Sequence, residues 1–196
     1  MTVVIGLTGS IGMGKTTASK MLHRLGLPIC DSDSLVHKML AKGGAAVPFV
    51  SDVFDNVISG GAIDREALGK QVFGNAEALK QLEQIMHPLV RAAQKKFIKT
   101  CFGRRLFSVV LDVPLLFEVE TDKFCDLTLV VSAPKFIQEQ RVLARPGMTQ
   151  ERFEATLRRQ MPDFEKRKRA DIIVQTGLNK RQTLDQLTKI VGWLRH

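Results

Sequence analysis

A glycine-rich loop near the start of the chain has the residue types and the spacing that bind phosphate. The run Gly9-Ser10-Ile11-Gly12-Met13-Gly14-Lys15-Thr16 fits the pattern G-x-x-x-x-G-K-[ST], between a predicted strand and a predicted helix. Glycines let the backbone wrap around phosphate groups with its N–H groups pointing inward, and the helix start adds the positive end of a dipole. We expect nucleotide phosphates to contact Ile11, Gly12, Met13, Gly14, Lys15, Thr16 and Thr17.

Two side chains of this loop have chemical roles of their own. Lys15 is expected to reach the β- and γ-phosphates, and the Thr16 hydroxyl is expected to bind Mg²⁺, since this hard cation prefers oxygen ligands. The alternative is a glycine-rich turn before a helix that is capped by Thr16 or Thr17. Such loops serve GTPases, ATPases and small-molecule kinases, but the chain has no N-K-x-D run for guanine selection, which weakens the GTPase interpretation.

Carboxylates follow two further predicted strands. Asp31-Ser32-Asp33 ends an apolar stretch, where a carboxylate could accept the proton of an alcohol that attacks the γ-phosphate. We assign this role to Asp33, and leave open that Asp31 or Asp33 instead caps the next helix. Asp112 follows the apolar strand 106–111 and fits a carboxylate that holds Mg²⁺ through water, although hydrophobic strands ending in Asp are common.

An excess of positive charge indicates an anionic partner. The net charge is +9, and residues 135–169 hold ten Lys or Arg against five Asp or Glu. Gln138, Arg141 and Arg145 share one face of a helix predicted to follow a cap at Ser132. These residues could close over ATP together, and an arginine there would neutralise charge in the transition state. For every single arginine of the segment except Arg141, a solvated basic face is the better interpretation.

The hydrophobic pattern alternates between strands and helices along the chain. Strands are predicted at 3–7, 27–30, 106–113, 127–131 and 172–174, and helices at 15–25, 35–40, 65–73, 76–86 and 88–99. This alternation predicts an α/β fold, a P-loop NTPase-type doubly wound parallel sheet that carries a helical substrate-binding insertion and a helical lid.

The predicted elements indicate one domain with two additions. Its core comprises 1–40, 104–133 and 170–196, with a helical insertion at about 41–103 and a basic lid segment at about 134–169. Within the insertion Pro88 is expected to restart the chain into a new helix, and His87 before it could be either buried or a donor to substrate.

Composition excludes several other classes. With 196 residues and 44% hydrophobic content the chain can bury a sizeable core, and its longest apolar runs are far too short to span a membrane. The start lacks the features of a secretory signal, so a cytoplasmic location is the expectation. Cys30, Cys101 and Cys125 are widely spaced, which favours buried or partly buried thiols over a zinc site.

Several motifs together resemble the dephospho-CoA kinase family, and the likeness runs from the first strand almost to the end of the chain. The discriminating pieces are Leu82-Glu83-Gln84-Ile85-Met86-His87-Pro88 and Asp112-Val113-Pro114-Leu115-Leu116-Phe117-Glu118. The others are Gly6-Leu7-Thr8-Gly9 leading into the loop, Asp31-Ser32-Asp33, Ile63-Asp64-Arg65, Gln138-x-x-Arg141-x-x-x-Arg145, Gln160 and Ala170-Asp171.

The resemblance implies transfer of the ATP γ-phosphate to the ribose 3′-hydroxyl of dephospho-CoA, with Mg²⁺ as cofactor. It implies Asp33 as the proton acceptor, Lys15 and Arg141 as groups that stabilise the transferred phosphoryl group, and a helical CoA-binding insertion. The acceptor side would be lined by Arg65, His87, Leu115 and Glu118. The chain departs from the usual family pattern at Ser10, Met13, Ser32 and Gln175. Met13 could alter loop packing or nucleotide affinity.

Two rival functions stay open at this point. One is a kinase of another small hydroxylated acceptor, and the other is a nucleotide-dependent protein whose basic surface binds nucleic acid. The run Lys166-Arg167-Lys168-Arg169 is the densest charge cluster, and we expect a solvated helix face there rather than a tether. The expected partners are therefore ATP and dephospho-CoA, with no nucleic acid and no membrane, for a monomer or small homo-oligomer.

Overall fold

The computed structural model describes residues 2–195, and the chain forms two compact units. One contains the residues up to Cys30 together with those from Thr100 onward, and the other contains Asp31–Lys99. These boundaries come earlier in the sequence than those of the predicted insertion, 41–103. The assignment of a CoA-binding function to the insertion and of a lid function to 134–169 stays a prediction.

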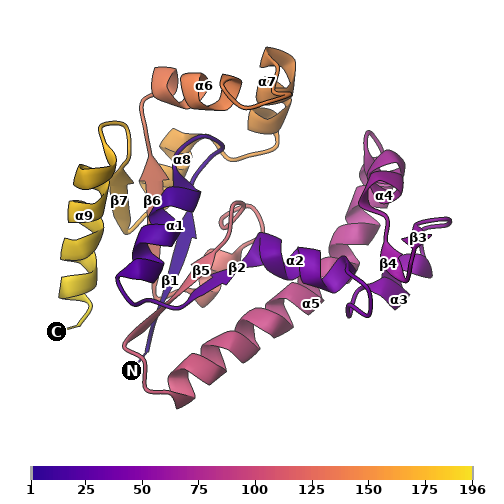
Figure 1. Ribbon diagram of the computed structural model, residues 1–196, viewed down its shortest axis with the longest axis horizontal. Coiled ribbons are helices and arrows are strands. Elements are labelled where there is room, and N and C mark those ends of the chain that lie inside the picture. Colours follow the sequence, from indigo (N-terminus) through magenta and orange to yellow (C-terminus); the bar gives the residue numbers. More distant parts are fainter. Residues whose placement is uncertain (1, 196) are drawn as a thin grey trace. The chain divides into compact units, whose positions relative to one another are not determined.

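A five-stranded sheet organises the first unit (Figure 1). Its strands are β1 (Val3–Thr8), β2 (Ile29–Asp31), β5 (Ser108–Asp112), β6 (Leu127–Ser132) and β7 (Ile172–Gln175), in the order β2-β5-β1-β6-β7. β1 pairs in parallel with β5 and β6, and β6 pairs in parallel with β7. The parallel α/β sheet predicted from the sequence is thus confirmed.

Helices flank this sheet. In the first unit they are α1 (Lys15–Arg24), the short 3₁₀ helix η1 (Thr121–Phe124), α6 (Lys135–Leu143), α7 (Gln150–Arg158), α8 (Asp163–Arg169) and α9 (Lys180–Trp193). α6 begins after Pro134 and not after a cap at Ser132, which is the last residue of β6. The Ser132 hydroxyl instead donates to Asp163 Oδ2 at 2.7 Å, so it ties the end of β6 to the start of α8.

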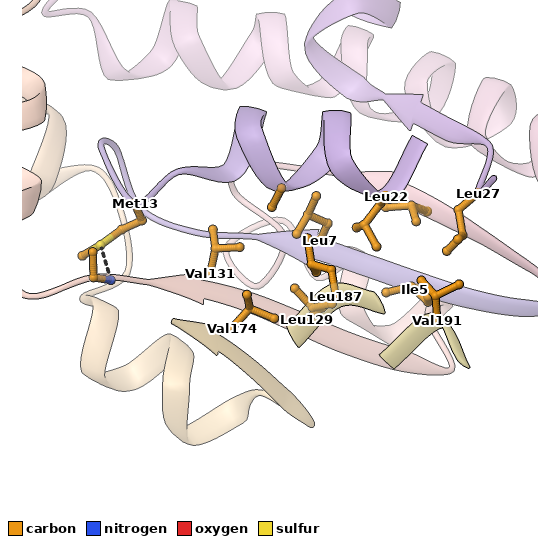
Figure 2. Packing of buried hydrophobic residues seen from close by; sticks show 13 residues of the cluster. Ile5, Leu7, Met13, Leu22, Leu27, Leu129, Val131, Val174, Leu187 and Val191 are labelled. Atoms are coloured by element: carbon orange, nitrogen blue, oxygen red, sulfur yellow. Dashed lines mark hydrogen bonds between the residues drawn. The ribbon is translucent and has the colours of Figure 1, made fainter. Parts of the chain in front are cut away.

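The core follows from the period of two along β1, because successive side chains of a strand point to opposite faces. Ile5 and Leu7 are fully buried in a cluster with Leu22 of α1 and with Leu187 and Val191 of α9 (Figure 2). Gly6 between them faces the other way. A methyl group there would lie 2.8 Å from the Cys125 sulfur and 2.9 Å from Leu116 Cδ2, so the 116–125 region covers the opposite face.

The three thiols are buried or partly buried, as the sequence predicted. Cys30 and Cys101 are buried and Cys125 is partly buried. Burial, with the nearby charges of Asp122 and Asp126, raises the pKa of Cys125 to about 12. This thiol is therefore inert at neutral pH, because the thiolate is the reactive form.

The second unit has its own core. Its elements are α2 (Ser32–Leu40), α3 (Val47–Ser51), the strands β3 (Ile58–Ser59) and β4 (Ala62–Ile63), α4 (Arg65–Val72) and most of α5 (Ala76–Gly103). Its buried cluster includes Val50, Phe54, Val57 and Ile63. The antiparallel hairpin of β3 and β4 was not predicted, since two residues a strand are too few to show alternation.

The prediction that Pro88 starts a new helix is wrong. α5 is one helix of 28 residues with Pro88 inside it. A proline inside a helix removes one backbone hydrogen bond and costs about 3 kcal/mol. Leu82, Ile85 and Met86 before it and Leu89 after it pack into the same cluster, so a continuous apolar face offsets that cost.

Among the described residues, no helix combines the length and hydrophobicity needed to cross a membrane.

Candidate functional site

The phosphate-binding loop connects the end of β1 at Thr8 to the start of α1 at Lys15. Gly12 and Gly14 have φ angles of 79° and 88°, a left-handed backbone that side chains disfavour. Gly14 is the N-cap of α1, and its carbonyl oxygen accepts the N–H groups of Thr17 and Ala18. The loop therefore ends at a helix N-terminus, which is the geometry that binds an anion.

Met13 anchors this loop in the core. Its side chain is buried in the cluster below the loop, and its sulfur accepts the Ala133 N–H at 3.1 Å (Figure 2). The Met13 carbonyl accepts the Thr176 hydroxyl at 2.7 Å. The large side chain thus fixes the loop to the residue that follows β6 and is a packing group, while the backbone carbonyl fixes the loop to the residue that follows β7.

Lys15 and Asp112 form the closest ion pair of the site. Lys15 Nζ lies 2.6 Å from Asp112 Oδ1, and the two side chains are 16% and 5% exposed. The pair follows from the sheet, because Asp112 ends β5 opposite Leu7 of β1. Sequence reasoning expected both residues at the γ-phosphate and its metal, and the fold brings them together.

The donors beside this pair fit a hard cation. Thr16 is exposed at the first turn of α1, directly after Lys15, and Asp112 supplies a carboxylate. Hydroxyl and carboxylate oxygens are ligands that Mg²⁺ accepts, usually together with water and substrate phosphates. Among residues 2–195 no group of three or more His, Cys, Asp or Glu could hold a metal ion.

Arg141 of α6 lies beside the loop. Its Nη2 donates to the Thr176 carbonyl at 2.6 Å, and its Nη1 is 3.3 Å from the Thr176 hydroxyl and 3.4 Å from the Gly12 carbonyl. Arg145, one turn later, is exposed. The predicted basic face therefore separates into one arginine held at the phosphate-binding loop and one at the surface.

Two glutamines hold the backbone of the same loop at Ile11. Gln138 of α6 donates to the Ile11 carbonyl at 2.8 Å, and Gln160, after α7, accepts the Ile11 N–H at 2.9 Å. The Gln138 side chain is 5% exposed. Both side chains come from the segment predicted as a lid, so this segment contacts the loop directly.

The prediction that Lys166-Arg167-Lys168-Arg169 is a solvated face is wrong for its first residue. Lys166 is fully buried, with Nζ 2.9 Å from Glu118 Oε1 and 3.0 Å from the Pro114 carbonyl. Lys166 lies on the inner side of α8, because one side of every surface helix faces the core. Burial lowers the pKa of Lys166, a shift opposed by Glu118 and Asp163 and reinforced by the positive charge of Lys15.

The remaining sequence-predicted residues divide between the units. Leu115, in the first unit, is 36% exposed after β5. Asp33, Arg65 and His87 belong to the second unit, where Arg65 Nη1 lies 3.0 Å from His37 Nε2 and His87 is half-buried.

The alternative left open for the two aspartates is resolved for one of them. Asp31 is the N-cap of α2, and its Oδ1 accepts the N–H groups of Asp33 and Ser34 at 3.0 and 3.2 Å. Asp33 is in the first turn of α2 and is exposed. Asp31 therefore has the structural role, and its bonds fix the backbone that carries Asp33.

Sequence reasoning missed Thr176, which bonds Met13 and Arg141 at once. A signal existed, since Thr176 directly follows β7 and the residues after parallel strands gather at one edge of the sheet. Gln160 belongs to the family pattern but its sequence position gave it no role, and Lys166 was read only as part of a charge run. Their contacts depend on how α7 and α8 return to the sheet, which no local pattern encodes.

Comparison with known proteins agrees with this geometry. The sequence model of the family described as dephospho-CoA kinase matches residues 3–182. A dephospho-CoA kinase of Paramagnetospirillum magneticum is 57% identical over 84% of this chain and 77% of its own length. That of Rhodospirillum rubrum is 50% identical over 94% of this chain and 88% of its own.

A solved structure shares the fold of this chain. A crystal structure of a Thermus thermophilus protein is 35% identical, covers 98% of this chain and 97% of its own, and superposes with a TM-score of 0.84. The match of the family model over most of the chain, together with these curated relatives, shows that the chain belongs to the dephospho-CoA kinase family.

Proposed function

We propose that this chain transfers the γ-phosphate of ATP to the ribose 3′-hydroxyl of dephospho-CoA, giving coenzyme A and ADP, with the residue roles described below. Membership of the family makes the chain an ATP-dependent kinase. The observation that carries the residue assignment is the Lys15–Asp112 pair at 2.6 Å, beside a glycine-rich loop that ends at a helix N-terminus.

The nucleotide is bound by the loop from Ile11 to Thr17. Its N–H groups and the N-terminus of α1 attract the phosphates, and Lys15 exchanges its contact with Asp112 for the β- and γ-phosphate oxygens. Arg141 lies within reach of the same loop, with Nη1 3.4 Å from the Gly12 carbonyl, and its charge stabilises the transferred phosphoryl group. Thr16 and Asp112 would hold Mg²⁺, which when bound neutralises charge on the phosphates.

Asp33 receives the proton of the acceptor. It lies in the first turn of α2, two residues after β2 ends, and is exposed. An aspartate there orients the 3′-hydroxyl and accepts its hydrogen as the bond from oxygen to the γ-phosphorus forms and the bond to the β-phosphate breaks. ADP is the leaving group.

Four residues are proposed for the acceptor side, following the family resemblance: Arg65, His87, Leu115 and Glu118. Arg65 and His87 can donate hydrogen bonds, and Leu115 has an exposed apolar side chain. Glu118 Oε1 is occupied by Lys166 Nζ and by the Met161 N–H, so its contribution to acceptor binding is indirect. We further propose Mg²⁺ as the metal, a cytoplasmic location, and a monomer or small homo-oligomer.

The test is mass spectrometry of the products after incubation of the purified protein with Mg²⁺, ATP and dephospho-CoA. Coenzyme A and ADP are expected in equal amounts, and the Lys15→Ala variant should form neither. Adenosine and another ribose 3′-hydroxyl compound serve as alternative acceptors. ATP binding without coenzyme A formation, or equal turnover of adenosine, would overturn the proposed acceptor.

A further inference from the structure

Lys166 is a buried cation that the proposed reaction does not use. Its Nζ contacts Glu118 Oε1 at 2.9 Å and the Pro114 carbonyl at 3.0 Å. The same Pro114 carbonyl accepts the hydroxyl of Thr8, the last residue of β1, at 3.0 Å. Lys166 is thereby connected to the strand from which the phosphate-binding loop departs.

Glu118 extends this connection to the loop itself. Its Oε1 also accepts the Met161 N–H at 2.7 Å, which fixes the backbone directly after Gln160. The Gln160 carboxamide oxygen then accepts the Ile11 N–H at 2.9 Å. A chain of contacts of 2.7 to 2.9 Å therefore runs from Lys166 through Glu118 and the backbone at Gln160 to Ile11 of the loop.

Stability alone does not explain this arrangement. Burying an ion pair removes two charges from water, and replacing such a pair with apolar side chains is often neutral or stabilising. The positive charge of Lys15 adds to the effect of burial, because both disfavour the charged form of Lys166. The pair does, however, give the carboxylate a fixed direction, and the carboxylate fixes the backbone beside Gln160.

We propose that Lys166 and Glu118 are positioning residues for nucleotide binding, which act by holding Gln160 against the Ile11 N–H. The ion pair sets the path of the backbone at Gln160 and Met161, and the Gln160 side chain sets the direction of the peptide before Ile11. Gln138 holds the following peptide through the Ile11 carbonyl, so both peptides around Ile11 have fixed directions. This inference rests on the proposed role of the loop in ATP binding.

The experiment measures the equilibrium Kd of ATP in the absence of acceptor, and separately the KM of each substrate. The variants are Lys166→Met, Gln160→Leu and their double variant, with Arg167→Met as the matched control. Arg167 is the next residue of the same charge run and is exposed. Arg167→Met therefore removes one positive charge, as Lys166→Met does, but it disturbs no buried side chain. Urea unfolding of each variant checks that it is folded.

Lys166→Met and Gln160→Leu are each expected to raise the Kd of ATP about tenfold, the equivalent of one lost hydrogen bond that orders the loop. In Gln160→Leu, which leaves the Lys166–Glu118 pair intact, the KM for dephospho-CoA should stay within about twofold, and Arg167→Met should match the wild type. Because both residues act through the Ile11 contact, the Kd of ATP in the double variant should be no higher than the higher of the two single-variant values.

Three results would overturn the inference. One is a Kd for ATP in Lys166→Met equal to that in Arg167→Met, and another is a double variant whose loss is the product of the two single losses. Gln160→Leu leaves the ion pair intact, so unchanged ATP binding in this variant also overturns it, even where Lys166→Met does not fold. Failure of the proposed function is distinct, because it would appear as absence of coenzyme A formation by the wild type.

Discussion

Lys15 Nζ lies 2.6 Å from Asp112 Oδ1, so the lysine of the phosphate-binding loop is paired with the carboxylate that ends the neighbouring strand. The pairing of β1 with β5 produces this contact, because it places Leu7 opposite Asp112. Asp112 is almost fully buried, and a carboxylate in such a position needs a cationic partner. Asp112 therefore holds Lys15, and its proposed second role is to contribute oxygens to a cation site.

The first prediction concerns Asp112. In Asp112→Asn the carboxylate charge is lost while the shape stays, and we expect kcat to fall about 100-fold because a charged group at the phosphates is removed. The Mg²⁺ concentration for half-maximal rate should rise, and initial rates over a Mg²⁺ series measure it. Exposed Asp185→Asn is the control. An unchanged Mg²⁺ dependence would remove Asp112 from the cation site.

A second prediction separates the two aspartates after β2. Asp33→Asn should leave the Kd of ATP near the wild-type value while turnover falls by roughly 10² to 10⁴, since a general base contributes to the chemical step. Asp31→Asn is the matched control, because asparagine caps a helix about as well as aspartate does. Steady-state rates and ATP titration measure both. Near-normal turnover in Asp33→Asn, or equal losses in both variants, would refute the assignment.

The third prediction concerns the backbone of the phosphate-binding loop at Gly12. Its φ of 79° disfavours any side chain, and a methyl group would lie 2.6 Å from Val142 Cγ2 and 2.9 Å from the Gln138 carbonyl oxygen. Gly12→Ala should therefore lower the free energy of unfolding by about 3 kcal/mol, from backbone strain and overpacking together. ATP binding should weaken as well.

Gly43→Ala is the control for Gly12→Ala. Gly43 has a φ of 72° with nothing within 4 Å of the added methyl group, so only the strain of roughly 1–2 kcal/mol should appear. Urea unfolding measures both variants. Equal destabilisation of the two would show that the contacts of Gly12 with α6 contribute nothing.

The fourth prediction is a pH dependence of stability at Asp171. Asp171 Oδ2 accepts the hydroxyl and the N–H of Thr128, each at 2.7 Å. These hydrogen bonds lower the pKa of Asp171 below its ordinary value of 3.8. A carboxyl with a lowered folded-state pKa stabilises the fold above pH 3.8, and this contribution disappears as the pH falls through the lowered pKa.

Asp171→Asn should therefore cost about 1 kcal/mol of unfolding free energy at pH 7, a value kept small because the residue is exposed. The difference from the wild type should shrink below pH 3.8. Urea unfolding across a pH series measures it, with exposed Asp55→Asn expected to stay within about 0.5 kcal/mol throughout. A difference that does not change with pH would contradict the assignment.

Local sequence was sufficient for the sheet and for the phosphate-binding loop. Short apolar runs, most of them rich in β-branched residues, predicted β1, β2, β5, β6 and β7 to within a few residues, because strand formation depends on short patterns. The loop needed only its own spacing and the flanking strand and helix. The basic helix with Arg141 was also visible, since a period of 3.6 places its residues on one face.

Contacts distant in sequence were not predictable in the same way. The residues around Pro88 predict a helix start. α5 continues through Pro88 because apolar side chains before and after it pack into the same buried cluster. The run of four consecutive cations predicts that Lys166 is exposed. Only the packing of α8 against the rest of the first unit buries Lys166 beside Glu118. Whether a polar residue is buried depends on what packs over it, which its neighbours in sequence do not specify.

The sequence by itself therefore determined the candidate chemistry of this protein, because the phosphate-binding loop and the proposed roles of Lys15, Asp112 and Arg141 follow from residue type and short spacing. The tertiary structure decided how that chemistry is held in place. The contacts of Gln160, Thr176 and Lys166 join segments more than 40 residues apart, and only the close packing of the folded chain brings such groups within hydrogen-bonding distance.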